Sequence, residues 1–269
     1  MSKVIEANRQ VHSALIESGE YQRSPHRSPE SRRRVKEKIL RLGLPGGANY
    51  AHLDVGCGDG FIFECVPEVW NRSGVDVTDA MLMECGKRHP DVRLLRGQAE
   101  RLPIESDSID FITCYSFLDH LEDTAEFFAE AMRVLKSGGH FYFGLSPNRD
   151  FLRQLHIAQN FDLSQELKAL DLAVEAKKAF DDGAYYQERF GIQASALQDC
   201  EPGKSIKMGL LPSEETAKLQ AVGAARASVI YEWIFQQNRI DPDAVKLIES
   251  FLPFTAACFK YFDLVGRKK

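Results

Sequence analysis

The residues with the clearest chemical meaning lie in one short stretch, Asp54 to Gly60, which reads Asp-Val-Gly-Cys-Gly-Asp-Gly. The apolar residues before it predict a buried strand, and Gly56, Gly58 and Gly60 predict a tight turn whose backbone approaches a ligand closely. Doubly wound α/β sheets bind ligands in such loops, where the amides of a following helix meet polar groups. The stretch therefore predicts a site for a nucleotide-like cofactor.

The spacing of the glycines separates two cofactor classes. A dinucleotide fingerprint has its third glycine where this chain carries Phe61, which argues against a nicotinamide cofactor. With the third glycine at Gly60, the stretch resembles motif I of the class I S-adenosylmethionine (SAM) dependent methyltransferases. In that family the acid and the glycines hold the methionine end of the cofactor. The binding residues that this resemblance implies are Asp54, Gly56, Cys57, Gly58 and Gly60.

A second acid, Asp76, closes the next predicted strand, 22 residues after Asp54 (76 − 54). Rossmann-type folds place a carboxylate at about this offset to accept hydrogen bonds from ribose hydroxyls. A carboxylate suits that task because it presents only acceptors. The residues after it resemble the family's continuation past the ribose-binding acid, so Val77 and Met81 are further candidates. The alternative is an ordinary acid at a strand end.

After the third predicted strand, residues 97–103 resemble the family's Gly-Asp-Ala-Glu-x-Leu-Pro segment. The resemblance implies that Gln98 meets the adenine amino group and that the amide of Ala99 meets a ring nitrogen, with Glu100 beside them. Gln98 stands where the family has an acid. Its side-chain carbonyl still accepts a hydrogen bond, without the contribution of a charge.

The fourth predicted strand, 109–115, is a nearly continuous apolar run, which is typical of a buried parallel strand. It resembles family motif IV, which implies that Tyr115 and Ser116 border the methyl-transfer centre. His120 follows in a segment similar to the family's Leu-x-His-Leu-x-Asp. Because an imidazole titrates near neutral pH, His120 is the candidate base for a hydroxyl or carbon acid. The alternative is a structural histidine bonded to a neighbouring carbonyl.

Tyr21 lies in a polar loop between two predicted N-terminal helices. In this family an N-terminal segment often folds over the cofactor, and the resemblance implies that Tyr21 packs near the methionine carboxylate. The alternative is a loop aromatic that holds the two helices together, which suits an amphipathic tyrosine equally well.

Phe117 to His120 is also similar to the magnesium-dependent catechol O-methyltransferases, in which the aspartate, here Asp119, is a metal ligand. A magnesium site needs further oxygen ligands after the fifth strand, and residues 146–148 supply no acidic partner. The seven histidines include no pair at helical metal spacing. The sequence therefore predicts no metal site.

These motifs follow one another over residues 50–147, and their order predicts a Rossmann-like, seven-stranded mixed sheet with helices on both faces. We expect an N-terminal helical cover over 1–48 and a SAM-binding core over 49–150. Good helix formers dominate 161–180 and 214–237, which predicts a large helical insertion or lid over 151–257. The alternating residues within 258–269 predict the final antiparallel strand of the core.

Composition narrows the function further. The net charge of −5 argues against a nucleic-acid partner. No apolar run reaches the roughly 18 residues needed to span a bilayer, and no apolar leader follows Met1, so we expect a cytoplasmic protein without a membrane span. The six cysteines contain no Cys-x-x-Cys pair and are expected to be reduced.

The sequence therefore predicts an enzyme that transfers a methyl group from SAM to a small-molecule acceptor and releases S-adenosylhomocysteine (SAH). The tetrad with which amine-specific nucleic-acid methyltransferases hold a flipped base is absent after the fourth strand. The alternative is a non-catalytic SAM-binding or scaffold protein whose helical insertion serves a partner. Whether the insertion is a lid or an arm that makes a homodimer stays open.

Overall fold

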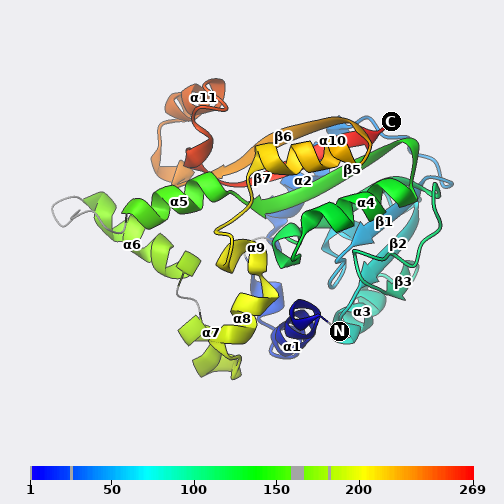
Figure 1. Cartoon of the computed structure of the whole chain (residues 1–269), viewed down its shortest axis with the longest axis horizontal. Helices are drawn as coiled ribbons and strands as arrows, with labels where there is room; N and C mark the ends of the chain where they lie inside the picture. Colours follow the sequence, from blue (N-terminus) through cyan, green and yellow to red (C-terminus); the bar gives the residue numbers. More distant parts are fainter. Residues whose placement is uncertain (1, 25–26, 159–166, 181–182) are drawn as a thin grey trace.

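In a computed structural model of the protein, residues 2–24, 27–158, 167–180 and 183–269 are described, and they place helices on both faces of a mixed sheet (Figure 1). Within these ranges the sheet has seven strands in the order β3-β2-β1-β4-β5-β7-β6, and β7 runs antiparallel to both neighbours. The predicted fold class is thereby confirmed. The strands are β1 (Ala51–Val55), β2 (Asn71–Asp76), β3 (Arg93–Arg96), β4 (Ile109–Tyr115), β5 (Leu135–Pro147), β6 (Ala224–Ile234) and β7 (Phe259–Lys268).

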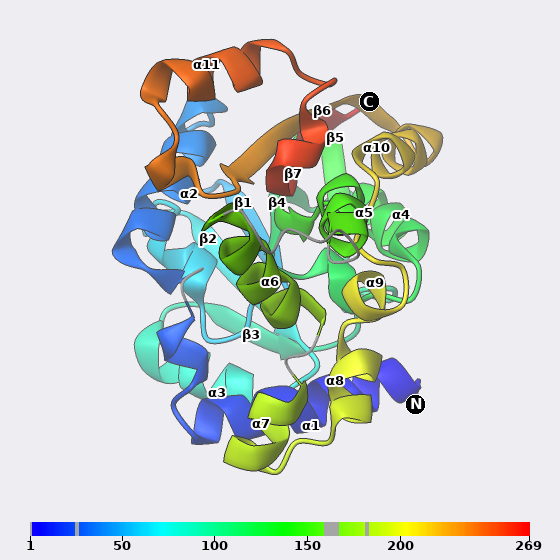
Figure 2. The same cartoon turned by 90° about the vertical axis from the view of Figure 1, so that its left-hand side faces the viewer.

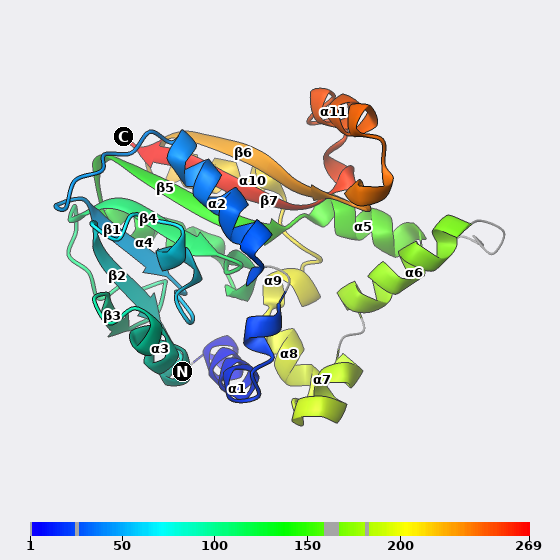
Figure 3. The same ribbon diagram turned by 180° about the vertical axis from the view of Figure 1, so that it is seen from behind.

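Helices cover the two faces of the sheet in different ways. Helices α4 and α10 lie on one face (Figure 1), and α2 crosses the other face over β5, β6 and β7 (Figure 3). The bounds of these and the neighbouring helices are α2 (Pro29–Arg41), α3 (Asp79–Arg88), α4 (Thr124–Val134) and α10 (Pro212–Ala221). Short 3₁₀ turns follow the first and fourth strands, η3 (Phe61–Glu64) and η4 (Leu118–His120).

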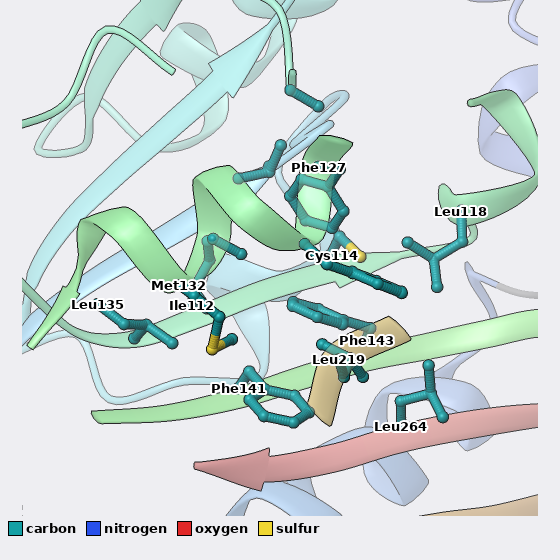
Figure 4. Close-up of a cluster of buried hydrophobic side chains, with 14 of the residues drawn as sticks. Ile112, Cys114, Leu118, Phe127, Met132, Leu135, Phe141, Phe143, Leu219 and Leu264 are labelled. Carbon is teal, nitrogen blue, oxygen red and sulfur yellow. The ribbon is translucent and has the colours of Figure 1, made fainter. Parts of the chain in front are cut away.

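The apolar core lies on both faces of the central strands. The continuous apolar run of β4 predicts this burial. On the α4 side, Phe127 of α4 packs against Phe143 of β5 with ring centroids 5.2 Å apart, and Leu264 of β7 joins the same cluster (Figure 4). On the α2 side, Val35 and Ile39 belong to a second cluster that includes η3 and Trp70, which precedes β2. The two clusters hold the strand ends at fixed positions.

A group of helices lies beyond the carboxyl ends of the parallel strands. Figure 2 shows α1, α7 and α8 together, with α6 above α7 and in front of the sheet. Helix α1 packs directly on α8 and α3. These elements are α1 (Lys3–Glu17), η1 (Tyr21–Arg23), α5 (Arg149–Ala158), α6 (Leu167–Phe180), α7 (Gly183–Phe190), α8 (Ala194–Cys200) and α9 (Pro202–Ser205).

The structure corrects the predicted helix over 214–237. Helix α10 ends at Ala221, and residues 224–234 form the edge strand β6, paired antiparallel with β7. Its β-branched and aromatic residues, such as Val229 and Trp233, favour a strand, and pairing with β7 outweighs the helix formers around them. The stretch 151–257 therefore contains a core strand, and helix α11 (Pro242–Ser250) lies between β6 and β7.

Two further points concern the predicted division of the chain. Helix α6 occupies the second part of the helix predicted over 161–180, and residues 161–166 lie outside the described residues. The division into a cover, a core and an insertion stays a prediction. Across the part of the chain that the structure describes, none of the helices has the length and apolar character needed to cross a membrane.

Candidate cofactor and acceptor site

A cavity of about 1080 Å³ lies at the carboxyl ends of β1, β2 and β4, beneath α1 and the helices α6 to α8. Most of the residues that the sequence predicts to bind the cofactor or to act on the acceptor line it. They are Tyr21, Asp54, Gly56, Cys57, Gly58, Asp76, Val77, Met81, Ala99, Tyr115, Ser116 and His120. The topology brings these residues together because parallel strands end at one edge of the sheet.

Three predicted residues lie outside the cavity wall: Gly60, Gln98 and Glu100. Gly60 begins η3, and a Cβ built on it would meet the His89 ring at 2.4 Å, so it faces α3. Gln98 is exposed, and Glu100 is half-buried with a pKa raised by burial. Gln98 does not line the cavity, and the adenine contact expected of it stays a prediction, whereas Ala99 does reach the wall.

Asp76 holds two loops in place at the end of β2. One carboxylate oxygen accepts from the amide of Gly58 at 2.9 Å, and the other accepts from the amide of Thr78 at 2.8 Å. Burial raises the pKa of Asp76, and these two amides partly offset that effect. The carboxylate thus faces the cavity on a rigid support, which suits an acceptor for hydroxyl groups.

The glycine loop is closely covered by two aromatic side chains. A Cβ at Gly56 would lie 2.2 Å from the Phe117 ring, and one at Gly58 would lie 2.7 Å from the Tyr21 hydroxyl. Both glycines have positive φ, at +66° and +52°. The guanidinium of Arg27 lies 4.8 Å from the centre of the Tyr21 ring. Tyr21 therefore covers the loop from η1, and its expected place near the methionine carboxylate stays a prediction.

Asp54 lies at the base of the cavity and is buried. Its carboxyl accepts a hydrogen bond from the Thr113 hydroxyl at 2.6 Å, and that hydroxyl in turn lies 2.9 Å from Nε2 of His52. Burial raises the pKa of Asp54 to about 8, while the bond from Thr113 lowers it and the charge of Asp76 raises it. Burial thus favours a neutral carboxyl, and a cationic group placed beside it would favour the charged form.

The end of β4 forms the wall between the glycine loop and the part of the cavity that α1 and α6 to α8 line, here called the acceptor side. Tyr115 stacks on Phe61 with ring centroids 4.7 Å apart, and the buried Met81 of α3 also lines the cavity. Ser116 has a φ of +52°, and its amide donates to the carbonyl of Gly144. The turn after β4 is thereby fixed against β5, as a site that positions two reactants requires.

His120 lies in η4 with its ring against a second histidine. Its Nδ1 lies 3.0 Å from the carbonyl oxygen of Cys200, so Nδ1 carries the proton and donates to that carbonyl. The ring centroid of His12, from α1, is 5.1 Å away. Burial, with a contribution from His120, lowers the pKa of His12 to about 3. The bond to a carbonyl is the structural role weighed for His120, and it leaves Nε2 with the lone pair.

Sequence reasoning missed two residues of the cavity wall, His12 and Glu201. His12 and Glu201 line the cavity from α1 and from the turn between α8 and α9, together with Asp119 of η4. Nothing local in the sequence marks His12 or Glu201, because their place depends on how two distant helices fold over the sheet. Tyr185, Tyr186 and Trp233 add aromatic wall on the same side.

The fold, the glycine loop and the acid after β2 define a protein that binds a nucleotide-like cofactor at the carboxyl edge of its sheet. The family described as methyltransferase domain matches residues 53–143, which contain the glycine loop, Asp76 and the end of β4. Together with the seven-stranded fold, this match supports a class I SAM-dependent methyltransferase domain that contains residues 53–143 and uses SAM as its cofactor.

Known proteins resemble a stretch that makes up 36% of this chain. A probable SAM-dependent methyltransferase of Mycolicibacterium smegmatis is 34% identical over 98 residues, which are 36% of this chain and 38% of that protein. The phthiotriol/phenolphthiotriol dimycocerosates methyltransferase of Mycobacterium tuberculosis is 33% identical over 104 residues, 36% of this chain and 38% of that protein. The chain thus spans 38% of the length of these curated relatives.

The fold extends the likeness to nearly the whole chain. A SAM-dependent methyltransferase of Thermotoga maritima, described as a possible histamine N-methyltransferase, aligns with 97% of this chain and 99% of its own length. Its TM-score is 0.57 and its sequence identity is 15%, so the likeness concerns the fold.

Proposed function

We propose that the protein transfers a methyl group from SAM to a small-molecule acceptor bound in the same cavity. The observation that carries this proposal is the continuity of the cavity, whose wall runs from Asp76 and Gly58 to Tyr186 and Trp233. Its volume of about 1080 Å³ is slightly above the usual range for small-molecule sites, roughly 300 to 1,000 Å³. This volume leaves space for both a cofactor and an acceptor.

The roof over this cavity favours a small acceptor. Helices α1, α6, α7 and α8 contribute lining residues on the side opposite the glycine loop. Such a cover excludes water from the transfer centre, which an activated methyl group requires. The named activity of the mycobacterial relative, a dimycocerosates methyltransferase, is consistent with a non-macromolecular acceptor.

In this proposal the chain's residues mainly position the two reactants. Asp76 accepts from the ribose hydroxyls, Asp54 and the glycine loop hold the methionine end, and Tyr115 with Ser116 borders the transferring methyl group. When bound, SAM would supply an activated methyl group for in-line displacement by the acceptor's lone pair, with SAH as the neutral leaving thioether. For a hydroxyl acceptor, Nε2 of His120 takes the proton, because Nδ1 already donates to the Cys200 carbonyl.

The test is the formation of SAH from SAM in the presence of a fractionated small-molecule extract. Product SAH is measured by chromatography, and the methylated acceptor is found by transfer of an isotopically labelled methyl group. We expect stoichiometric label in a compound of low molecular mass, and its loss in Asp76→Ala. A protein that binds SAH tightly but labels no compound in any fraction contradicts the proposal and favours a non-catalytic SAM-binding protein.

A further inference from the structure

We propose that Asp119, His120 and Glu201, with His12 opposite them, form a binding site for one divalent transition-metal ion on the acceptor side of the cavity. One ligand atom from each of Asp119, His120 and Glu201 lies within 4.8 Å of the other two. His12, His120 and Cys200 form a second such group around the same imidazole. The two groups share His120, which is therefore the centre of the proposed site.

Asp119 gives a second, independent indication that a ligand binds at this place. Its side chain is only 6% exposed and lines the cavity. Its Oδ1 has no hydrogen-bond partner among the residues that the structure describes. A buried carboxylate oxygen without a partner is costly, since it has lost its water and gained nothing in exchange. A bound cation removes that cost.

The surroundings of His120 match those of a metal-binding histidine. Metal ligands of this type usually donate their second ring N–H to a carbonyl or carboxylate, which fixes the tautomer and the ring orientation. Nδ1 of His120 donates to the carbonyl of Cys200 at 3.0 Å, so the lone pair is on Nε2. His12 of α1 lies beside this ring, with the two ring centroids 5.1 Å apart.

The local charge also favours a cation. Asp119 and Glu201 bring two carboxyl groups to the site, and Lys204 lies 3.1 Å from one oxygen of Glu201. The ammonium of Lys204 balances the charge of only one of the two carboxyl groups. The site can therefore accommodate the charge of a further cation.

The donor set indicates which metal. Imidazole with carboxylate suits Zn²⁺, Mn²⁺ or Fe²⁺, whereas Mg²⁺ prefers oxygen ligands and water. The sequence predicts no metal because it offers Asp119 no acidic partner nearby. The structure supplies that partner as Glu201, which follows Asp119 by 82 residues (201 − 119) and approaches through α8 and α9. Its arrangement thus differs from an oxygen-only magnesium site.

The inference does not rest on methyl transfer, since metal binding is measured without SAM or acceptor. It does bear on His120. A metal ion on Nε2 uses the lone pair that a base needs, so His120 acts as a base only in protein without metal. The metal content therefore decides between the two roles.

The experiment measures metal binding to the full chain. The protein is treated with a chelator, dialysed, and titrated with Co²⁺, whose visible absorption reports coordination, and with Zn²⁺ in competition. We expect one equivalent of Co²⁺ per chain, displaced by Zn²⁺. Asp119→Asn and Glu201→Gln keep the shape of each side chain and are expected to weaken binding at least about tenfold.

Matched controls separate this site from adventitious histidines and acids. His140→Gln on β5 and Glu214→Gln on α10 lie outside the cavity wall and are expected to bind Co²⁺ as the wild type does. Thermal unfolding checks that every variant is folded. Absence of Co²⁺ binding in the folded wild type, or equal binding by Asp119→Asn and Glu201→Gln, overturns the proposal. SAH binding by the same variants shows separately whether the cofactor site is intact.

Discussion

The amide of Gly58 donates a hydrogen bond to a carboxylate oxygen of Asp76 at 2.9 Å, across the gap between the first and second strands. The second oxygen of Asp76 accepts from the amide of Thr78. The acid that the resemblance assigns to the ribose therefore also fixes the glycine loop. The loop and the ribose acceptor form one rigid unit, so a change in either is expected to affect cofactor binding.

Gly58→Ala is predicted to abolish SAH binding. The added methyl group would lie 2.7 Å from the hydroxyl of Tyr21, and φ at this position is +52°, which an alanine rarely adopts. Gly46→Ala is the control, because a Cβ there meets nothing within 4 Å. Calorimetric titration with SAH checks both variants. Binding by Gly58→Ala at the wild-type affinity contradicts the close approach described for this loop.

The double variant Tyr21→Phe with Gly58→Ala is predicted to be more stable than Gly58→Ala alone. Removal of the hydroxyl relieves the shorter contact, since the next ring atom would be 3.6 Å away, while the backbone strain at φ +52° remains. Urea unfolding compares the double variant with both single variants. An additive loss in the double variant means that the two side chains do not meet.

Because Asp54 is buried, the free energy of unfolding is predicted to depend on pH. Its pKa is raised to about 8 in the folded protein, mainly by burial, and lies near 4 when unfolded. Between these values the folded state binds more protons than the unfolded state, so the free energy of unfolding falls as pH rises from about 4 to about 8. Because Asn does not titrate, Asp54→Asn removes this component.

The measurement is urea unfolding of the ligand-free protein at pH 7.0, 7.5 and 8.5, a window above the ordinary pKa of histidine. We expect the free energy of unfolding to fall less steeply with pH for Asp54→Asn than for the wild type. Asp79→Asn, an exposed acid at the start of α3, is expected to follow the wild-type slope. Equal slopes for Asp54→Asn and the wild type refute the buried neutral carboxyl.

Lys38→Met is predicted to destabilise the protein by about 3 to 5 kcal/mol, because it leaves two buried carboxylates without their cation. Nζ of Lys38 lies 2.7 Å from Glu232 and 2.5 Å from Asp263, where it ties α2 to the hairpin of β6 and β7. Lys36→Met, on the exposed side of the same helix, is the control. If both variants unfold at the same urea concentration, the ion pairs add nothing to stability.

Phe143→Ala is predicted to cost about 3 to 5 kcal/mol of stability, since its ring is fully buried between β5 and α4. The matched control is Phe254→Ala, because that ring is 91% exposed and a surface change usually stays within about 0.5 kcal/mol. Thermal unfolding compares the two. A large loss for Phe254→Ala would show that this ring is covered in solution.

The parts of the fold predicted from the sequence are those in which local pattern and chemistry coincide. Asp54, Gly58 and Asp76 lie at or just after the ends of strands that apolar runs predict. Because parallel strands end at one edge of the sheet, these residues come together there. Strand β6 was not predicted, because its residues include Ala, Arg and Glu, and only its pairing with β7 makes it a strand.

The acceptor side shows the same limit more strongly. His12 and Glu201 are 189 residues apart (201 − 12), and both reach the cavity only because α1 packs on α8. Gln98 shows a different case, in which a matching motif is present but the exposed side chain is not among the residues that line the cavity. Local patterns fix where strands end, and long-range packing decides which side chains meet there.

The central claim is that this cavity binds the methyl donor through Asp76, and calorimetric titration with SAH tests it most directly. We predict one SAH per chain for the wild type and for Asp79→Ala. Asp76→Ala is predicted to bind roughly 10- to 100-fold more weakly, the cost of losing hydrogen bonds to a charged group. A folded wild type that binds no SAH, or an Asp76→Ala variant with unchanged affinity, would contradict the account.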